Sequence, residues 1–221
     1  MTIQNLDFKA ANSLLKNAVD GQLLAGVSAA VMFSGEVVDT FCIGMADMES
    51  GEAMRTDHIH RAYSNTKIMT SMLVLKLADD GYFSIDDPIK KWIPVFGKVC
   101  VLKPNATTLV DTEALQNDIT IRHLLSHQAG LSHGVFDMGT MIFNAYHASG
   151  ARKSDTTLEQ LMDQLGGLPL IYQPGQGWEY SMAPDVLARL VENVTGQAYA
   201  DAVKTRLFDP LGMVDTTYVL R

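Results

Sequence analysis

A serine and a lysine stand three residues apart in the run Arg61-Ala62-Tyr63-Ser64-Asn65-Thr66-Lys67. Residues three apart on a helix lie on one face, so the Lys67 amine would reach the Ser64 hydroxyl one turn back. Free N–H groups at a helix N-terminus favour the negative charge of a nucleophile. Burial in the first turn lowers the pKa of a lysine amine, which is then able to accept a proton near neutral pH. The alternative is that Ser64 only caps the helix, and the local sequence leaves both interpretations open.

The helix that must position this pair is predicted from about Ser64 to Gly81. Apolar residues recur there at intervals of three and four, and glycine is a common stop signal. We expect one face of this helix to be buried, and the apolar residues that predict this face are Ile68, Met72 and Leu75.

Tyr180 is a second candidate for chemistry. It follows the turn Pro174-Gly175 and precedes a helix predicted from Pro184 to Gly196. A tyrosine just before a helix can present a catalytic phenol. On its own, such a residue is more often a packed aromatic whose hydroxyl is hydrogen-bonded.

Two further serine motifs compete with Ser64. Ser13-Leu14-Leu15-Lys16 repeats the Ser-x-x-Lys spacing, but it lies in a polar amphipathic segment and is interpreted as a surface pair. Gly130-Leu131-Ser132-His133-Gly134 matches the nucleophile-elbow pattern Gly-x-Ser-x-Gly. An elbow needs a strand before it, whereas a helix is predicted there, so we interpret the segment as a loop. Ser132 is kept as the alternative nucleophile.

The histidines offer no complete metal site. His58 and His60 have no third ligand close in the sequence. His123 and His127 are four apart, but no glutamate follows His123 as the zinc-protease motif requires. We interpret this second pair as helix-capping or core histidines, and we predict neither a metal nor a cofactor.

Charge and composition limit the partners. The 221 residues carry a net charge of -8 with a pI near 5.1, and no basic stripe is present to meet phosphates, so no nucleic-acid partner is expected. The N-terminus lacks a basic and apolar leader, and no apolar run reaches membrane-spanning length. We therefore expect a soluble, cytoplasmic protein without membrane contact. Cys42 and Cys100 are too few for a disulfide framework and are expected to be reduced core residues.

The remaining elements are short. A hairpin is predicted to turn at Ser34-Gly35-Glu36, where glycine allows a positive φ. No other strand is expected before the far C-terminus. The expected elements are a helix over 7–20, strands over 27–33 and 37–43, a tight Asp-Pro turn leading into a short amphipathic helix within 84–94, a polar surface excursion over 100–118, and a helix over 119–127 entered through Thr120 and ended by Gly130.

Five motifs occur in order along the chain: Ser64-Asn65-Thr66-Lys67, Gly81-Tyr82-Phe83-Ser84-Ile85-Asp86-Asp87-Pro88, Ile119-Thr120-Ile121-Arg122-His123-Leu124-Leu125-Ser126-His127, Pro174-Gly175 through Tyr180-Ser181, and Pro210-Leu211-Gly212-Met213-Val214-Asp215-Thr216. Together they resemble the serine β-lactamase and penicillin-binding-protein superfamily. Within it, the chain resembles class C β-lactamase-like enzymes and the family VIII carboxylesterases. The resemblance covers essentially the whole chain, and it is specific because all five motifs occur together.

The resemblance implies a fold and a set of site residues. The fold would be an α/β domain, an antiparallel sheet flanked by helices, with a mainly helical domain inserted and the site between them. We expect the first part of the α/β domain over residues 1–85, the helical domain over 86–180, and an incomplete return to the α/β domain over 181–221. The family's nucleophile, lysine and tyrosine carry over onto Ser64, Lys67 and Tyr180. The residues expected to contact the substrate are Tyr63, Trp178, Met182 and His133.

Two departures from the family pattern matter. β-Lactamases usually have Tyr-x-Asn where this chain has Tyr180-Ser181-Met182, so a thioether replaces the amide that would bind the β-lactam side chain. The segment resembles the esterases more. No Lys-Thr-Gly or His-x-Gly box follows Tyr180, and the chain reaches Arg221 in a strand predicted to begin near Tyr218. We therefore expect the N-terminal part of a longer enzyme, or half of a split one whose second chain completes the sheet.

We interpret the chain as a serine hydrolase that cleaves short-chain carboxylic esters through an acyl-enzyme on Ser64. Tyr180 and Lys67 would share the proton, and the sequence does not decide which is the base because their titrations are coupled. A β-lactamase, a peptidase or an acyltransferase on the same residues is the alternative, as is a catalytically silent binding module of the same fold. The expected partner is a small-molecule ester.

Overall fold

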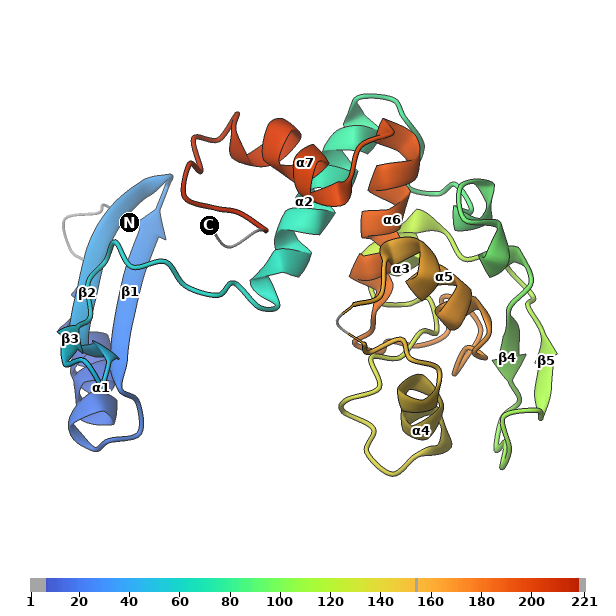
Figure 1. Ribbon diagram of the computed structural model, residues 1–221, viewed down its shortest axis with the longest axis horizontal. Coiled ribbons are helices and arrows are strands. Elements are labelled where there is room, and N and C mark those ends of the chain that lie inside the picture. The colour runs from blue at the N-terminus through green and yellow to red at the C-terminus, as the bar shows by residue number, and fades with distance from the viewer. Residues whose placement is uncertain (1–6, 154, 219–221) are drawn as a thin grey trace. The chain divides into compact units, whose positions relative to one another are not determined.

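The computed structural model describes residues 7–153 and 155–218. Contacts between Cα atoms divide the chain into two compact units, Met1–Arg61 and Ala62–Arg221 (Figure 1). The helix that carries Ser64 and Lys67 therefore belongs to the same unit as Tyr180. This boundary differs from the division predicted at residues 85 and 180, which stays a prediction.

The first unit is a helix beside a small antiparallel sheet. It contains α1 (Lys9–Asp20), β1 (Gly26–Phe33), β2 (Glu36–Asp47) and β3 (Glu52–Ala53), with the strands in the order β1-β2-β3. The predicted N-terminal helix and hairpin are confirmed, and the hairpin turns at Gly35 with φ of 84°. Ser13 and Lys16 both lie exposed on α1, as a surface pair.

This first unit has no buried core among its described residues. Every side chain from Asp7 to Arg61 is exposed or only half-buried. Small sheets generally need three full strands or a packed helix to be stable by themselves. The unit therefore derives little stability from burial of its own apolar surface.

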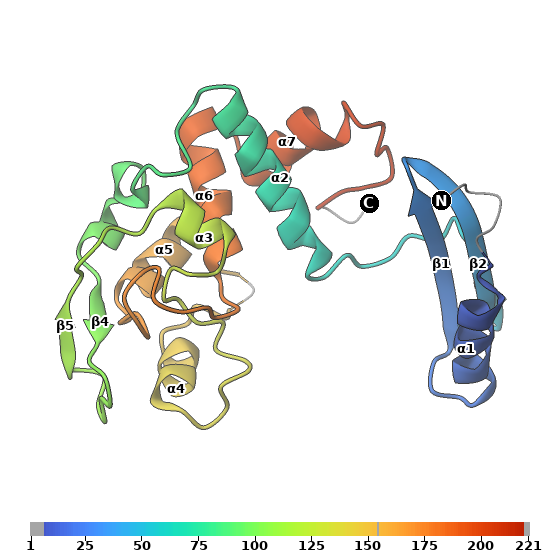
Figure 2. The same cartoon turned by 180° about the vertical axis from the view of Figure 1, so that it is seen from behind.

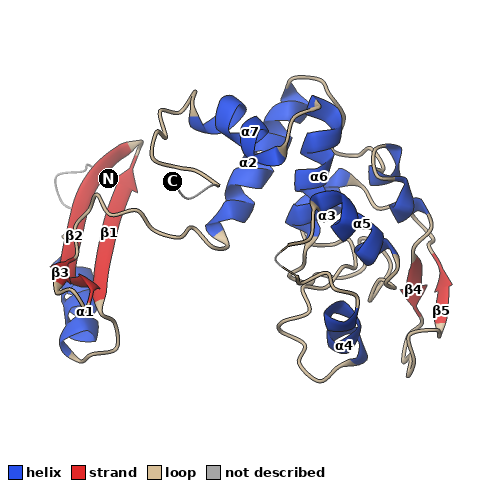
Figure 3. Cartoon of the chain, viewed as in Figure 1, coloured by secondary structure: helices blue, strands red, loops and turns tan. Residues whose placement is uncertain are grey.

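The second unit is built around α6 (Ala183–Thr195), which packs against α2, α3, α5 and α7 (Figure 2). Its predicted start and its stop at Gly196, with φ of 67°, are confirmed. The other elements, coloured by type in Figure 3, are α2 (Asn65–Asp79), η2 (Ile89–Lys91), η3 (Pro94–Gly97), β4 (Cys100–Leu102), β5 (Thr112–Ala114), α3 (Ile121–Leu125), α4 (Met141–Ala148), α5 (Leu158–Gly166), α7 (Tyr199–Val203) and the π-helix η4 (Lys204–Phe208).

Helix α2 buries a different face from the predicted one. Its buried residues are Thr70, Leu73, Val74 and Leu77, whereas Ile68, Met72 and Leu75 are exposed, Ile68 by 60%. Apolar residues surround this helix, so their spacing alone could not identify the buried side. Packing against α6, α7 and η4 decided it.

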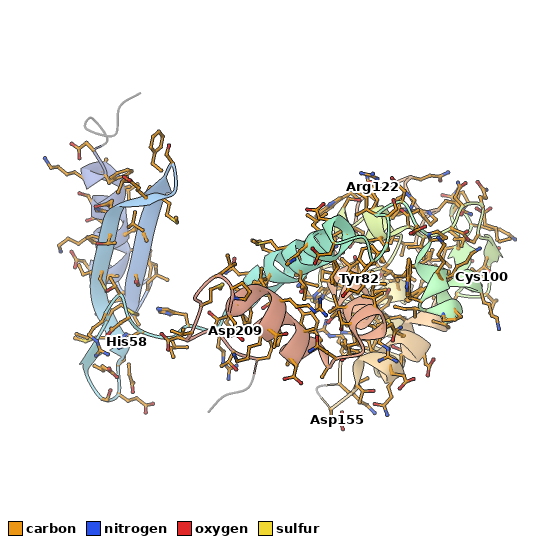
Figure 4. All side chains as sticks on the ribbon, turned by 90° about the horizontal axis from the view of Figure 1, so that it is seen from above. His58, Tyr82, Cys100, Arg122, Asp155 and Asp209 are labelled. Atoms are coloured by element: carbon orange, nitrogen blue, oxygen red, sulfur yellow. The ribbon has the colours of Figure 1, made fainter. Side chains whose placement is uncertain are left out.

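The segment over 100–118 is also more structured than predicted. It contains the two-stranded sheet β4–β5, and Leu170 joins it because its N–H donates to the Cys100 carbonyl at 2.9 Å. Strands of three residues are too short to show an alternating pattern. The predicted burial of both cysteines is wrong, because Cys100 is exposed on β4 (Figure 4) and Cys42 is only half-buried.

Three further expectations concern membrane spans, metal sites and the C-terminal strand. Within residues 7–153 and 155–218, no helix is both long and apolar enough to cross a membrane. The same residues contain no group of three or more His, Cys, Asp or Glu side chains placed to hold a metal ion. The strand predicted to begin near Tyr218 falls mainly on residues 219–221, which lie outside the described ranges.

We predict that substitutions on the two faces of α2 change the free energy of unfolding by different amounts. Leu73 is fully buried, so Leu73→Ala should lower the free energy of unfolding of the second unit by about 2–5 kcal/mol. Ile68→Ala, on the exposed face, should change it by less than about 0.5 kcal/mol. Urea unfolding of a complete enzyme, followed by near-UV circular dichroism, would measure both changes. Equal losses for the two variants would show that the burial of α2 is assigned wrongly.

Candidate active site

Ser64 stands at the N-terminal end of α2, and its hydroxyl does not cap the helix. The backbone of Ser64 is already helical, with φ of -68°, and its side chain makes no capping hydrogen bond. The preceding Tyr63 has a positive φ of 43°, which is uncommon for a residue other than glycine. Such backbone geometry concentrates at functional sites. The capping interpretation is therefore not what the structure shows, and the hydroxyl is available for another partner.

That partner is Tyr180. Its phenol donates a hydrogen bond to Ser64 Oγ at 2.8 Å, across 116 residues of sequence. Lys67 Nζ lies 4.9 Å from the centroid of the Tyr180 ring. The structure therefore brings together the three residues whose types suggested chemistry.

The electrostatics of Tyr180 suit a proton acceptor. Desolvation raises the pKa of its phenol, but hydrogen bonding with Lys67 and Ser64 and the positive charge of Lys67 outweigh this effect, so the pKa is lowered from its ordinary value. A lower pKa makes the phenolate accessible nearer to neutral pH. The direction is the one that a general base needs.

Two histidine rings stack on the same tyrosine. The His127 ring lies 5.0 Å from the Tyr180 ring, centroid to centroid, with 21° between the planes. The His133 ring lies 5.4 Å away at 25°. Burial, followed by the positive charge of Lys67, lowers the pKa of both imidazoles. The tyrosine is thus held among neutral aromatic neighbours.

Asp185 shares a cavity of about 390 Å³ with Lys67, beside the hydroxyl pair of Thr70 and Tyr199. The carboxylate lies in the first turn of α6. Burial raises the pKa of Asp185, and the positive charge of Lys67 partly opposes this. Sequence reasoning did not single out Asp185. Acidic residues are common in the first turn of a helix, so the residue type alone carries no functional signal.

Ser132 is a structural residue of a tight loop. Its side chain is only 1% exposed, and its Oγ accepts a hydrogen bond from the Gly134 N–H at 3.0 Å. A Cβ at Gly134 would lie 2.6 Å from Tyr146 Cβ, and one at Gly130 would lie 2.4 Å from the Tyr172 carbonyl oxygen. Close packing therefore explains both glycines. Helix α3 precedes the loop, which supports the loop interpretation over a nucleophile elbow.

The four residues expected to contact substrate have different surroundings. Tyr63 and Trp178 are exposed, Trp178 by 64%, and the Trp178 ring meets His127 edge-on at 6.1 Å. Met182 is half-buried against the core and its N–H donates to the Ser132 carbonyl. His133 stacks on Tyr180. Substrate contact by these residues stays a prediction.

His123 lies in α3 and His127 follows its C-terminal end, and the two histidines have different roles. His123 completes a capping box with Thr120, as the capping interpretation predicted. His127 has a positive φ of 57°, and the N–H of Ser181 donates to its Nδ1. The sequence does not predict the contact between His127 and Tyr180, because two segments more than fifty residues apart show no shared pattern.

Comparison with known proteins identifies the family. A family model described as Beta-lactamase matches residues 11–220. The chain belongs to the beta-lactamase family. Esterase EstB of Burkholderia gladioli is 34% identical over 94% of this chain and 50% of its own length. Lovastatin esterase of Penicillium rubens is 29% identical over 91% of this chain and 50% of its own length.

Solved structures agree on the fold. EstCE1, described as a hydrolase with promiscuous acyltransferase activity, superposes with a TM-score of 0.79 at 27% identity, over 92% of this chain and 51% of its own. Simvastatin synthase from Aspergillus terreus gives 0.77 over 97% and 54%, and at 24% identity it shows the fold alone. The predicted fold class is confirmed. The chain spans about half the length of the relatives that it matches.

The geometry predicts which serine reacts. Ser64→Ala should abolish ester hydrolysis in a complete enzyme and prevent adduct formation, because loss of a nucleophile costs several orders of magnitude in rate. Ser132→Ala should leave most of the ester hydrolysis and most of the adduct formation, since the Ser132 hydroxyl is buried and hydrogen-bonded. Mass spectrometry after exposure to an activated ester would map the adduct. An acyl group found on Ser132 would overturn the assignment.

Proposed function

We propose that this chain carries the nucleophile and the proton-transfer groups of a serine hydrolase that cleaves short-chain carboxylic esters. The observation that carries the proposal is the hydrogen bond between the Tyr180 phenol and Ser64 Oγ, with Lys67 Nζ over the Tyr180 ring. A nucleophile within hydrogen-bond reach of a base, and a third group that orients the base, is the arrangement expected of nucleophilic catalysis. The esterase relatives support the substrate class.

The proposed reaction has two steps. Ser64 Oγ attacks the ester carbonyl while its proton passes to the Tyr180 phenolate, which Lys67 stabilises, and the backbone N–H of Ser64 donates to the oxyanion. Collapse of the tetrahedral intermediate breaks the bond to the alcohol, which leaves with that proton. Water then attacks the acyl-enzyme and gives a proton to Tyr180. The bond between the acyl carbon and Ser64 Oγ breaks, Oγ takes the proton back from Tyr180, and the carboxylic acid is released. The lowered pKa of Tyr180 favours it over Lys67 as the base.

A second outcome follows from the same acyl-enzyme. If an alcohol rather than water attacks it, the protein transfers the acyl group. The acyltransferase activity in the description of EstCE1 supports this outcome. A β-lactamase and a peptidase have weaker support because Met182 replaces the amide, and a catalytically silent binding module has weaker support because the Ser64–Tyr180 contact is formed.

We also propose that a further segment or a second chain completes the sheet. The first unit lacks a buried core in its described part, and the exposed face of α2 carries Ile68, Met72 and Leu75. Exposed apolar surface of this kind marks an interaction site. The relatives are about twice as long as this chain, so a completing segment would correspond to the half of their length that this chain does not match. The cytoplasmic location stays a prediction.

Substrate preference provides the test of the ester assignment. Short p-nitrophenyl esters should be turned over far better than cephalosporins, because a missing hydrogen-bond partner costs roughly 1–3 kcal/mol. Met182→Asn should reduce the difference in kcat/KM between the esters and the cephalosporins, because it restores the side-chain amide that would bind the β-lactam. Steady-state kcat/KM values for both substrates would measure it. Comparable hydrolysis of a cephalosporin by the unaltered protein would contradict the proposal.

The completion proposal predicts how the 221 residues behave alone. They should be poorly folded and nearly inactive, since absence of one oxyanion donor typically lowers the rate by about 10²–10³. Hydrogen exchange should be fast throughout β1 and β2 and slower in the buried face of α2. Cooperative unfolding of the whole chain together with ester hydrolysis at ordinary enzyme rates would show that no completing segment is needed.

A further inference from the structure

His127 receives hydrogen bonds on Nδ1. The backbone N–H of Ser181 donates to this nitrogen at 3.1 Å, and Ser181 Oγ lies 3.0 Å from it. The same Oγ accepts from the Ala183 N–H at 3.3 Å, which leaves its own proton free to point at the imidazole. A backbone N–H can only donate. His127 Nδ1 is therefore unprotonated, and the ring proton of the neutral imidazole lies on Nε2.

His133 is held in the same form by a different donor. Arg152 Nη1 lies 3.3 Å from His133 Nδ1 and donates to the His133 carbonyl oxygen at 3.0 Å. A guanidinium group stays protonated and has no acceptor. The contact therefore requires an unprotonated Nδ1 on His133, as on His127.

The surroundings of both rings oppose their protonation. Burial and the positive charge of Lys67 lower the pKa of each imidazole. At His133, Arg152 and His127 act in the same direction, and together these effects outweigh a backbone hydrogen bond that raises the pKa of this ring. Lys67 Nζ also lies over the Tyr180 ring on which both imidazoles stack. An imidazolium here would place a second positive charge beside the lysine. With neutral imidazoles, the positive charge that acts on the phenol is that of Lys67.

We propose that His127 and His133 are positioning residues, which hold the Tyr180 phenol towards Ser64 as neutral imidazoles with Nδ1 locked as an acceptor. The donor to His127 Nδ1 is the Ser181 N–H, and the donor to His133 Nδ1 is the Arg152 guanidinium. This inference rests on the proposed function only because that function assigns proton transfer to Tyr180. The protonation state and the orienting effect are properties of the folded chain, and both can be measured without turnover.

The first experiment determines the protonation of both Nδ1 atoms by nitrogen NMR of 15N-histidine-labelled protein, in the complete form that includes the segment or second chain that finishes the sheet. Both Nδ1 atoms should be unprotonated at neutral pH, with titration midpoints below about 6.5, the ordinary value for histidine. Arg152→Ala, at an exposed position, should raise the His133 midpoint and leave that of His127 nearly unchanged. Lys153→Ala removes an equal charge from the next exposed residue and serves as the control. A protonated Nδ1 on His133, or equal shifts in both variants, would overturn the proposal.

The second experiment measures the positioning effect through the pKa of Tyr180, by carbon NMR of 13Cζ-tyrosine-labelled protein in the same complete form. His127→Asn keeps an acceptor for the Ser181 N–H and tolerates the positive φ of 57°, but it removes the stacked ring. The Tyr180 midpoint should rise, because the phenol loses its fixed approach to Lys67 and Ser64. His123→Asn, four residues earlier and part of the capping box, should leave it unchanged.

The two experiments separate this inference from the proposed function. An unmoved Tyr180 midpoint in His127→Asn overturns the positioning role, whatever reacts at Ser64. In a form of the protein that hydrolyses esters, the same variant should lower kcat while changing KM little. Failure of Ser64 to form an adduct, with the Tyr180 midpoint shifting as expected, would count against the hydrolase assignment and leave the positioning role supported.

Discussion

The hydrogen bond between Tyr180 and Ser64 depends on two segments that lie 116 residues apart in the chain. Ser64 begins α2, and Tyr180 lies just before α6, so their contact exists only because these two helices pack together. The packing buries Leu73 and Leu77 of α2 and the apolar face of α6. The two ends that carry the serine and the tyrosine are thereby held at a fixed distance. Burial of apolar surface in this way supplies most of the energy that fixes a site of this kind.

A second layer of structure holds the tyrosine from the other direction. The loop after α3 passes close to Tyr172 and Tyr146, and only glycine fits at Gly130 and Gly134. This tight loop carries His133, and the end of α3 leads into His127. Both histidines then stack on the phenol. A proton acceptor must keep its position to within a fraction of an ångström. Stacked rings that are fixed by their own hydrogen bonds help to hold it there.

The two units differ in how much of their stability they supply themselves. The second unit has a continuous hydrophobic core that includes α2, α5, α6 and α7. The first unit has backbone pairing between β1 and β2 but no fully buried side chain among its described residues. Hydrogen bonds between strands contribute little net free energy when the strands stay solvated.

Local features of the sequence were enough to determine several parts of this protein. Spacing placed the serine and lysine at the start of α2, turn chemistry placed the hairpin, and Thr120 predicted the start of α3, because periodicity, glycine turns and caps act within a few residues. Ordered motifs identified the family. Tertiary structure alone decided the buried face of α2, the short strands β4 and β5, the exposed position of Cys100, and the stacking of His127 and His133 on Tyr180. These features depend on which distant surfaces meet, and that choice reflects the total apolar area buried and the hydrogen bonds completed across the whole unit rather than any pattern within one segment.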